Sequence, residues 1–264
     1  MSGMYDRHDI GGVRSYRSLV VGVAVLCALV PAMAAQAVGA SARDFAPPPD
    51  GRPYTLRLSE TPGPHRLIIA LHGWKMDVSF METGDAITGD PNLDVALLRG
   101  FDVAYVAGTG DGSWNAGRCC GTASAMGVDD EGYVRDVIAD ARLADPSIVE
   151  TDAVGFSNGG MLAWRLACDG IVRAAVVVAG SLVAPCSRPV RVLHVHGLAD
   201  HTVPLKGGWS SYCSMTFPST VRPHLRHGST YRLVTWRGGH TWPTFATPLA
   251  VRFLVGSPPL PSRT

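Results

Sequence analysis

One serine between two glycines is the feature of this sequence best suited to covalent chemistry. The segment Gly155-Phe156-Ser157-Asn158-Gly159 has the pattern G-x-S-x-G, with an apolar run before it and an amphipathic segment after it. This spacing is typical of a nucleophile elbow, a sharp strand-to-helix turn that holds a serine hydroxyl above a parallel sheet. The glycines leave room for the turn because they have no Cβ to clash with neighbouring strands. The sequence therefore predicts Ser157 as a nucleophile.

A serine nucleophile needs a histidine to take its proton and an acid to orient that histidine, and with an elbow both come after the serine in the chain. Only two acids come after Ser157, namely Asp169 and Asp200. Asp169 lies along the helix predicted after the serine, about 18 Å away at 1.5 Å per residue, so it is out of reach. Asp200 comes directly after a predicted buried strand, at the sheet edge where such sites lie. We therefore predict Asp200 as the acid.

Six histidines come after Ser157, and His240 is the best placed to be the base. It lies in the segment G-G-H-T-W-P (238–243), directly after the last predicted strand. The two glycines allow the backbone to bring the imidazole over the serine, and the proline stiffens the chain beyond it. The others lie on a predicted strand, beside the acid or in a polar stretch: His194, His196, His201, His224 and His227.

The tetrahedral intermediate of such a reaction needs two N–H donors around its oxyanion. We predict one from the backbone of Asn158 and the other from the loop after the second strand, at Gly73 or Trp74. This chemistry requires neither a metal nor an organic cofactor, and no C-x₂-C spacing indicates a zinc site. We therefore expect no cofactor.

Continuous apolar runs with helical segments between them predict the sheet that positions these residues. The predicted strands are 54–58 at an edge, 66–71, 101–106, 149–156, 174–179, 190–195 and 231–236. Helices are predicted from Asp129-Asp130 to about Leu143, from about Gly160 to 167, and over 248–255, whereas 210–228 is expected to be loop. Continuous hydrophobic strands are typical of buried parallel sheets. We expect a doubly wound, mostly parallel α/β sheet of the α/β-hydrolase type in a single domain.

The N-terminal segment has the pattern of a secretory signal peptide. Arg14 and Arg17 precede an apolar run over 19–30, and small residues continue to 37. We assign 1–37 to the signal peptide, 38–52 to a Pro-rich linker, 53–258 to the catalytic domain and 259–264 to a tail. The run is short for a membrane span, although an uncleaved anchor stays as an alternative. We expect a secreted monomer with no stable membrane insertion after cleavage, and the net charge of +1 indicates no nucleic-acid partner.

Five cysteines lie beyond the predicted signal peptide: Cys119, Cys120, Cys168, Cys186 and Cys213. Export favours disulfides, and the odd number leaves at least one thiol free or paired elsewhere. We prefer the pair Cys168–Cys186, because both residues fall at the ends of elements that flank one predicted strand.

Six motifs in order resemble the secreted polyhydroxybutyrate depolymerase family, whose relatives include feruloyl and acetylxylan esterases of the α/β-hydrolase superfamily. They are L-H-G-W (71–74), W-N-A-G-R-C-C-G (114–121), V-D-D-E-G-Y (128–133), G-F-S-N-G-G-M (155–161), H-G-L-A-D-H-T-V-P (196–204) and G-G-H-T-W-P (238–243). The resemblance implies an esterase with Ser157, Asp200 and His240 as its triad. It also suggests that Trp114-Asn115 and the Cys119-Cys120 pair shape the rim of the active site.

The sequence indicates the type of reaction more clearly than it indicates the substrate. We expect a small or oligomeric ester, such as a short hydroxyalkanoate, bound by Trp114, Asn115 and Trp242. The segment between Asp200 and His240 looks short for the family, and we expect no second domain that grips a polymer, so a soluble ester is as good a candidate as a polymer. The alternatives are a feruloyl or acetylxylan esterase, a serine peptidase, an acyltransferase acting on a cell-envelope sugar, and a non-catalytic binding protein.

Overall fold

The computed structural model describes residues 42–44, 51–83 and 91–256. The predicted signal peptide and tail, and most of the predicted linker, lie outside these residues. All the described residues belong to one unit, Val38–Thr264. Within the described part of the chain, no helix is both long and apolar enough to cross a membrane.

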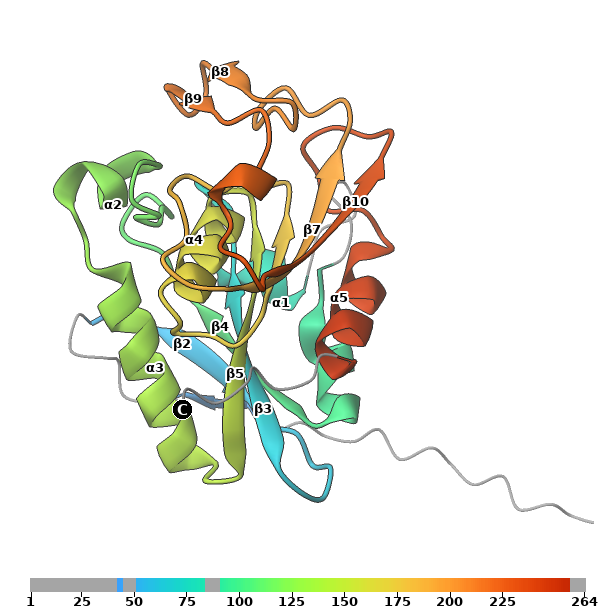
Figure 1. The fold of residues 1–264 in the computed structure, drawn as a ribbon. Helices are drawn as coiled ribbons and strands as arrows, with labels where there is room; N and C mark the ends of the chain where they lie inside the picture. The colour runs from blue at the N-terminus through green and yellow to red at the C-terminus, as the bar shows by residue number, and fades with distance from the viewer. Residues whose placement is uncertain (1–41, 45–50, 84–90, 257–264) are drawn as a thin grey trace, which may run out of the picture. The chain divides into compact units, whose positions relative to one another are not determined.

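The described strands form an eight-stranded sheet and a separate two-stranded one (Figure 1). The large sheet has the order β1-β2-β4-β3-β5-β6-β7-β10, and the small one joins β8 to β9. Strands β4, β3, β5, β6, β7 and β10 are parallel, whereas β1 and β2 are antiparallel to their neighbours. The bounds are β1 (Ala42–Asp44), β2 (Tyr54–Arg57), β3 (His65–Leu71), β4 (Phe101–Val106), β5 (Ile148–Phe156), β6 (Ala175–Val178), β7 (Arg191–Gly197), β8 (Gly208–Ser210), β9 (Met215–Phe217) and β10 (Thr230–Trp236).

Helices cover both faces of the large sheet. Side chains alternate along a strand, so in β3 Leu67 and Ile69 join one buried cluster while Ile68 and Ala70 join another. The first cluster contains side chains of α3 and α4, and the second contains side chains of α1, η1 and α5. The helix bounds are α1 (Val78–Glu82), η1 (Leu93–Arg99), α2 (Gly121–Met126), α3 (Asp130–Ala144), α4 (Ser157–Cys168), η2 (Arg222–His224) and α5 (Ala246–Val255). The expected doubly wound sheet is confirmed.

Helix α3 begins where its capping signal predicts. The Asp129 side chain accepts a hydrogen bond from the Gly132 backbone N–H, and two further acids lie in the first turn. Acidic side chains there stabilise a helix because its free N–H groups carry partial positive charge. The buried face of α3 includes Tyr133 and Val137, which fixes the helix against the sheet.

Three predicted elements differ from the structure. The strand at 54–58 is not at the edge, because residues Ala42–Asp44 of the predicted linker pair with it as β1. Helix α4 begins at Ser157 rather than near Gly160, so the predicted nucleophile itself occupies the first helical position. The predicted loop over 210–228 contains strand β9 and the short helix η2. These elements are only three residues long, too short for a periodic pattern to reveal them.

Candidate active site

The turn from β5 into α4 presents Ser157 with a left-handed backbone, at φ +52°. The glycines on either side are required by close backbone contacts. A Cβ on Gly155 would lie 2.3 Å from the Gly159 carbonyl oxygen, and one on Gly159 would lie 2.3 Å from the His72 carbonyl oxygen. Both distances are far below van der Waals contact, so the G-x-S-x-G spacing is a packing requirement of this turn.

The structure brings Ser157, His240 and Asp200 together. The Oγ atom of Ser157 lies 2.8 Å from Nε2 of His240, and Nδ1 of His240 lies 2.8 Å from Oδ2 of Asp200. The three residues come after β5, β10 and β7, which lie within four neighbouring strands of the sheet. Asp169, excluded on distance, lies just past α4 beside Arg165. The geometry is that of a nucleophile, a base and an orienting acid.

Asp200 is buried and held from several directions. Its Oδ1 accepts hydrogen bonds from the backbone N–H groups of Thr202 and Val203, at 2.9 and 2.8 Å. Its Oδ2 faces His240 and lies 3.2 Å from Nε2 of His196. Burial alone would raise the pKa of Asp200, but the hydrogen bonds from His196 and His240 hold that pKa well below its ordinary value. The carboxyl is therefore ionised at neutral pH, and it only accepts hydrogen bonds.

A buried chain of hydrogen bonds behind Asp200 was not predicted. Nε2 of His196 lies 2.8 Å from the Val203 carbonyl oxygen, which can only accept, so this nitrogen carries the proton. Nδ1 of His196 then accepts from Nε2–H of His194 at 2.8 Å, and Nδ1 of His194 accepts from the Tyr231 hydroxyl at 2.9 Å. Burial lowers the pKa of His194 to about 3, so it is neutral. The available signal was the H-x-x-x-D spacing of His196 and Asp200.

The loop after β3 packs directly against Ser157. A Cβ on Gly73 would lie 3.4 Å from the Ser157 Cβ. The loop is held by Trp114, whose indole N–H donates to the His72 carbonyl at 2.9 Å. The His72 ring is held as well, because its Nε2 accepts from the Gly108 N–H at 3.0 Å and its Nδ1–H donates to the Gly73 carbonyl at 2.8 Å. Burial lowers the pKa of His72, which keeps the ring in this neutral form.

The side chain of Asn158 has a role that sequence reasoning missed. Its Oδ1 accepts from the Trp114 backbone N–H at 2.7 Å, and its Nδ2 donates to the carbonyls of Trp114 and Cys119 at 3.0 and 3.3 Å. The side chain is buried. Asn158 therefore ties the segment before α2 to the elbow, while its own backbone N–H lies in the first turn of α4, where helical N–H groups have no partner within the helix.

Two of the predicted substrate contacts are buried in this structure. Trp114 is fully buried and Trp242 is 1% exposed, so neither indole has a surface to offer a ligand. The Trp242 N–H donates to the Thr247 hydroxyl. The side chain of Asn115 is used within its own segment, accepting from the Gly117 N–H and donating to the Val128 carbonyl. In this structure the polar groups of these three side chains are bonded within the protein.

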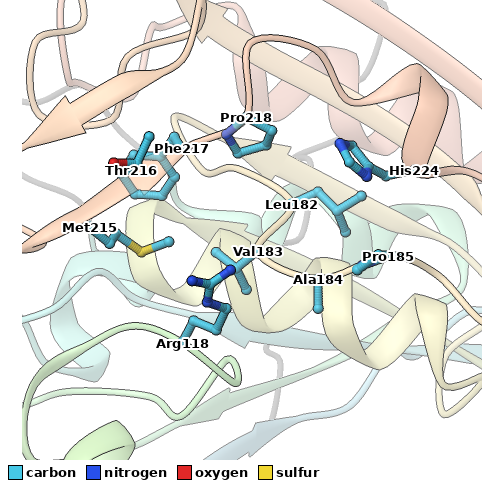
Figure 2. A pocket seen from close by; sticks show the side chains of 10 residues that line it. All are labelled: Arg118, Leu182, Val183, Ala184, Pro185, Met215, Thr216, Phe217, Pro218 and His224. Atoms are coloured by element: carbon cyan, nitrogen blue, oxygen red, sulfur yellow. The ribbon is translucent and has the colours of Figure 1, made fainter.

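A pocket of about 390 Å³ has ten lining residues, and none of them belongs to the triad (Figure 2). Its walls come from segments that lie after β4, β6 and β7 in the chain. The lining residues are Arg118, Leu182, Val183, Ala184, Pro185, Met215, Thr216, Phe217, Pro218 and His224. Most of these side chains are apolar, and Arg118 supplies a positive charge. Sequence reasoning identified none of them.

The cysteines pair as Cys168–Cys186, which confirms the preferred bridge, and as Cys119–Cys120. Of the cysteines in the described ranges, Cys213 lies outside a disulfide. Within those ranges, two groups have potential ligand atoms within 4.8 Å of one another. They are Cys119, Cys120 and Cys213, and His65, Asp102 and Asp145. Neither group contains a member of the triad.

Comparison with known proteins gives relatives among esterases, although no family model matches the chain. The chain is 31% identical over 169 residues to feruloyl esterase C of Emericella nidulans, covering 60% of this chain and 58% of that protein. It is 28% identical over 169 residues to a probable feruloyl esterase C of Aspergillus niger, with the same coverage. The chain thus spans less than two thirds of the length of these curated relatives.

Solved structures match over more of the chain. A Thermus thermophilus protein superposes with a TM-score of 0.56 at 20% identity, covering 83% of this chain and all of that one. A cold-adapted esterase from an Arctic intertidal metagenomic library gives 0.52 at 19% identity, covering 81% and 92%. The chain has the α/β-hydrolase fold. An acetyl xylan esterase from Thermoanaerobacterium shares it, with a TM-score of 0.52 at 18% identity over 77% of this chain and 78% of that one.

Proposed function

We propose that this protein is a serine hydrolase of carboxylic esters that works through an acyl-enzyme. The observation that carries the proposal is the imidazole of His240, which lies 2.8 Å from both Ser157 Oγ and Asp200 Oδ2. Because Asp200 is ionised and accepts from Nδ1–H, the lone pair of Nε2 faces the serine hydroxyl. That is the tautomer a general base needs.

In the first half of the reaction, Nε2 of His240 takes the proton of Ser157 as Oγ attacks the ester carbonyl. The negative charge that develops on the carbonyl oxygen rests on the backbone N–H of Asn158 and on an N–H of the Gly73-Trp74 loop, which packs against the serine. His240 then protonates the leaving alcohol, and the acyl group stays on Ser157.

In the second half, His240 takes a proton from water, which attacks the acyl-enzyme, and then returns a proton to Ser157 as the acid leaves. Asp200 stabilises the imidazolium in both halves without taking its proton. Asp200 can do so because its backbone hydrogen bonds and His196 favour its charged form.

For the substrate we propose an ester whose acyl group enters the pocket beside Leu182 and Met215. Two classes fit. The ordered motifs favour short hydroxyalkanoate esters or oligomers, and the positive charge of Arg118 suits the terminal carboxylate of such an oligomer. The names of the curated relatives favour a feruloyl ester, whose aromatic ring suits the apolar walls. We further propose that the protein is exported, since its cysteine pairs are typical of an oxidising compartment.

Hydrolysis of p-nitrophenyl butyrate by Ser157→Ala tests the mechanism. We expect kcat to fall on the order of 10⁴–10⁶, with loss of labelling by a fluorophosphonate and an unchanged melting temperature. Ser219→Ala is the matched control, because Ser219 is exposed and is not a member of the triad. Turnover that survived the loss of Ser157 would contradict the proposal.

A panel of esters separates the substrate classes. It contains p-nitrophenyl acetate to laurate, methyl ferulate and hydroxybutyrate oligomers, together with a peptide anilide. Faster hydrolysis of methyl ferulate would favour the phenolic class, and faster cleavage of oligomers the hydroxyalkanoate class. If the anilide were the best substrate, the protein would be a peptidase on the same fold.

A further inference from the structure

Three sulfur atoms meet beside the candidate active site. The Sγ atoms of Cys119, Cys120 and Cys213 all lie within 4.8 Å of one another. Cys119 and Cys120 are bonded to each other in the segment between β4 and α2, whereas Cys213 lies outside a disulfide, between β8 and β9. The two segments are about ninety residues apart in the chain, so the fold itself has brought a thiol against a disulfide.

We propose that these three cysteines form a thiol–disulfide exchange site, which moves one disulfide between a position inside the β4–α2 segment and a position that joins this segment to the β8–β9 hairpin. The proposal does not depend on the esterase chemistry. It rests on the approach of a thiol to a disulfide, which is the geometry that exchange requires.

The step is balanced within the protein. The Cys213 thiol loses its proton, and the thiolate attacks Sγ of Cys119 or Cys120. A new sulfur–sulfur bond forms as the old one breaks, and the released sulfur leaves as a thiolate that takes up a proton. One disulfide and one thiol are present before and after, so no oxidant or reductant is consumed.

The surroundings of Cys213 hold it in the resting, protonated form. Its backbone N–H donates to Ser210 Oγ at 3.1 Å, and the Ser210 hydroxyl donates to the Thr202 carbonyl at 2.6 Å. The Cys213 thiol lies 4.0 Å from the same carbonyl. Burial raises the pKa of Cys213, the hydrogen bond with the Ser210 side chain opposes this rise, and the nearby charge of Asp200 adds to it. Exchange is therefore slow at neutral pH and faster as the thiolate forms.

The new bond would link two segments that both contact the nucleophile's surroundings. The Cys119 carbonyl accepts from the side chain of Asn158, next to Ser157. On the hairpin, Tyr212 packs edge-on against Trp74 of the loop proposed to hold the oxyanion, with ring centroids 5.2 Å apart. A bond from Cys213 to either neighbour would tether the hairpin across this side of the site.

Peptide mapping of the full-length protein tests the proposal. Trypsin cleaves after Arg118 and Arg135, which places Cys119 and Cys120 on one peptide, 119–135. Cleavage after Lys206 and Arg226 places Cys213 on 207–226, because the bond before Pro223 resists trypsin. The protein is incubated without reductant at pH 7.0 and pH 8.5, blocked with N-ethylmaleimide and digested. We expect 119–135 disulfide-bonded to 207–226 and carrying one maleimide, in larger amount at pH 8.5.

Control variants separate exchange within the folded protein from random scrambling. Cys213→Ser should remove the cross-linked peptide completely, and the Cys168–Cys186 pair should stay intact in every digest. With oxidised glutathione present, Cys119→Ser or Cys120→Ser should form the bond from Cys213 to the cysteine that remains. Absence of the cross-link in the unsubstituted protein at both pH values would overturn the proposal. The proposal would also be overturned if Cys119→Ser and Cys120→Ser formed only mixed disulfides with glutathione.

Discussion

Replacing Asp200 with asparagine is the substitution whose effect the structure defines most closely. The two side chains have the same shape, but the amide has one oxygen and one NH₂ group. Its oxygen must face the backbone N–H groups of Thr202 and Val203, which lie 2.9 and 2.8 Å from Oδ1. The opposite orientation would leave both donors unpaired, and the buried Val203 N–H alone would cost about 1–3 kcal/mol. The NH₂ group is therefore directed at His240.

This orientation inverts the hydrogen bonding of the imidazole. An NH₂ group cannot accept from Nδ1–H, so His240 must place its proton on Nε2 and direct Nδ1 at the amide. Nε2–H then faces Ser157, and the base that should take the serine proton is lost. We expect kcat to fall by about 10⁴, equivalent to about 5 kcal/mol of transition-state stabilisation.

The assay is hydrolysis of p-nitrophenyl butyrate with the melting temperature measured in parallel. Asp169→Asn is the matched control, since Asp169 is the other acid after Ser157 and lies just past the far end of α4. We expect the control to keep kcat and both variants to keep the fold. A loss of less than tenfold for Asp200→Asn, with the fold intact, would refute the reasoning.

Three further substitutions test how the site is built and how the fold is stabilised. Asn158→Ala leaves the buried backbone N–H of Trp114 without its partner, so it should lower the free energy of unfolding, measured by urea denaturation, by about 1–3 kcal/mol. An unchanged urea midpoint would contradict a stabilising role for these hydrogen bonds between Asn158 and the Trp114 segment, which we call the Asn158 clamp. Gly159→Ala places a Cβ 2.3 Å from the His72 carbonyl oxygen and should yield little folded protein. Gly110→Ala is the control, because a Cβ there meets nothing within 4 Å. The yield of purified protein and its circular dichroism spectrum compare the two variants. Burial raises the pKa of Asp102 to about 6, so the folded state binds this proton more tightly than the unfolded chain, and stability falls as pH rises from about 4 through 6. Asp102→Asn should reduce the fall of melting temperature with pH over this range. If the variant and the unsubstituted protein showed the same fall, the assignment to Asp102 would be wrong.

The sequence predicted both the sheet and the group formed by Ser157, Asp200 and His240, because both depend on local signals. Buried parallel strands are continuous apolar runs, so β3, β4 and β5 were located to within a residue. The elbow has a required spacing, and only one of the two acids after Ser157 lies at the correct end of a strand. With these few candidates, elimination was enough to select Asp200.

Contacts between distant segments could not be predicted in this way. The clamp from Asn158 to Trp114 spans 44 residues, and no periodic pattern in either segment specifies it. The indole of Trp114 was expected to face a substrate, but an indole packs equally well inside a core when its N–H finds a carbonyl, as it does at His72. The approach of Cys213 to Cys119 and Cys120 likewise depends on where the β8–β9 hairpin packs, which no local sequence pattern predicts.

The separation of the small β8–β9 sheet from the large one has a consequence for how the sequence of this fold can be varied. The strands that carry Ser157, Asp200 and His240 hydrogen-bond within one sheet, whereas β9 pairs only with β8 among the described strands. Three neighbouring pocket residues, Met215 to Phe217, belong to β9. Insertions or exchanges in this hairpin can therefore change the shape of the pocket without altering the register of any strand beneath the triad. The pocket and the arrangement of Ser157, Asp200 and His240 are separable parts of this molecule, and a library confined to the hairpin would vary the first while preserving the second.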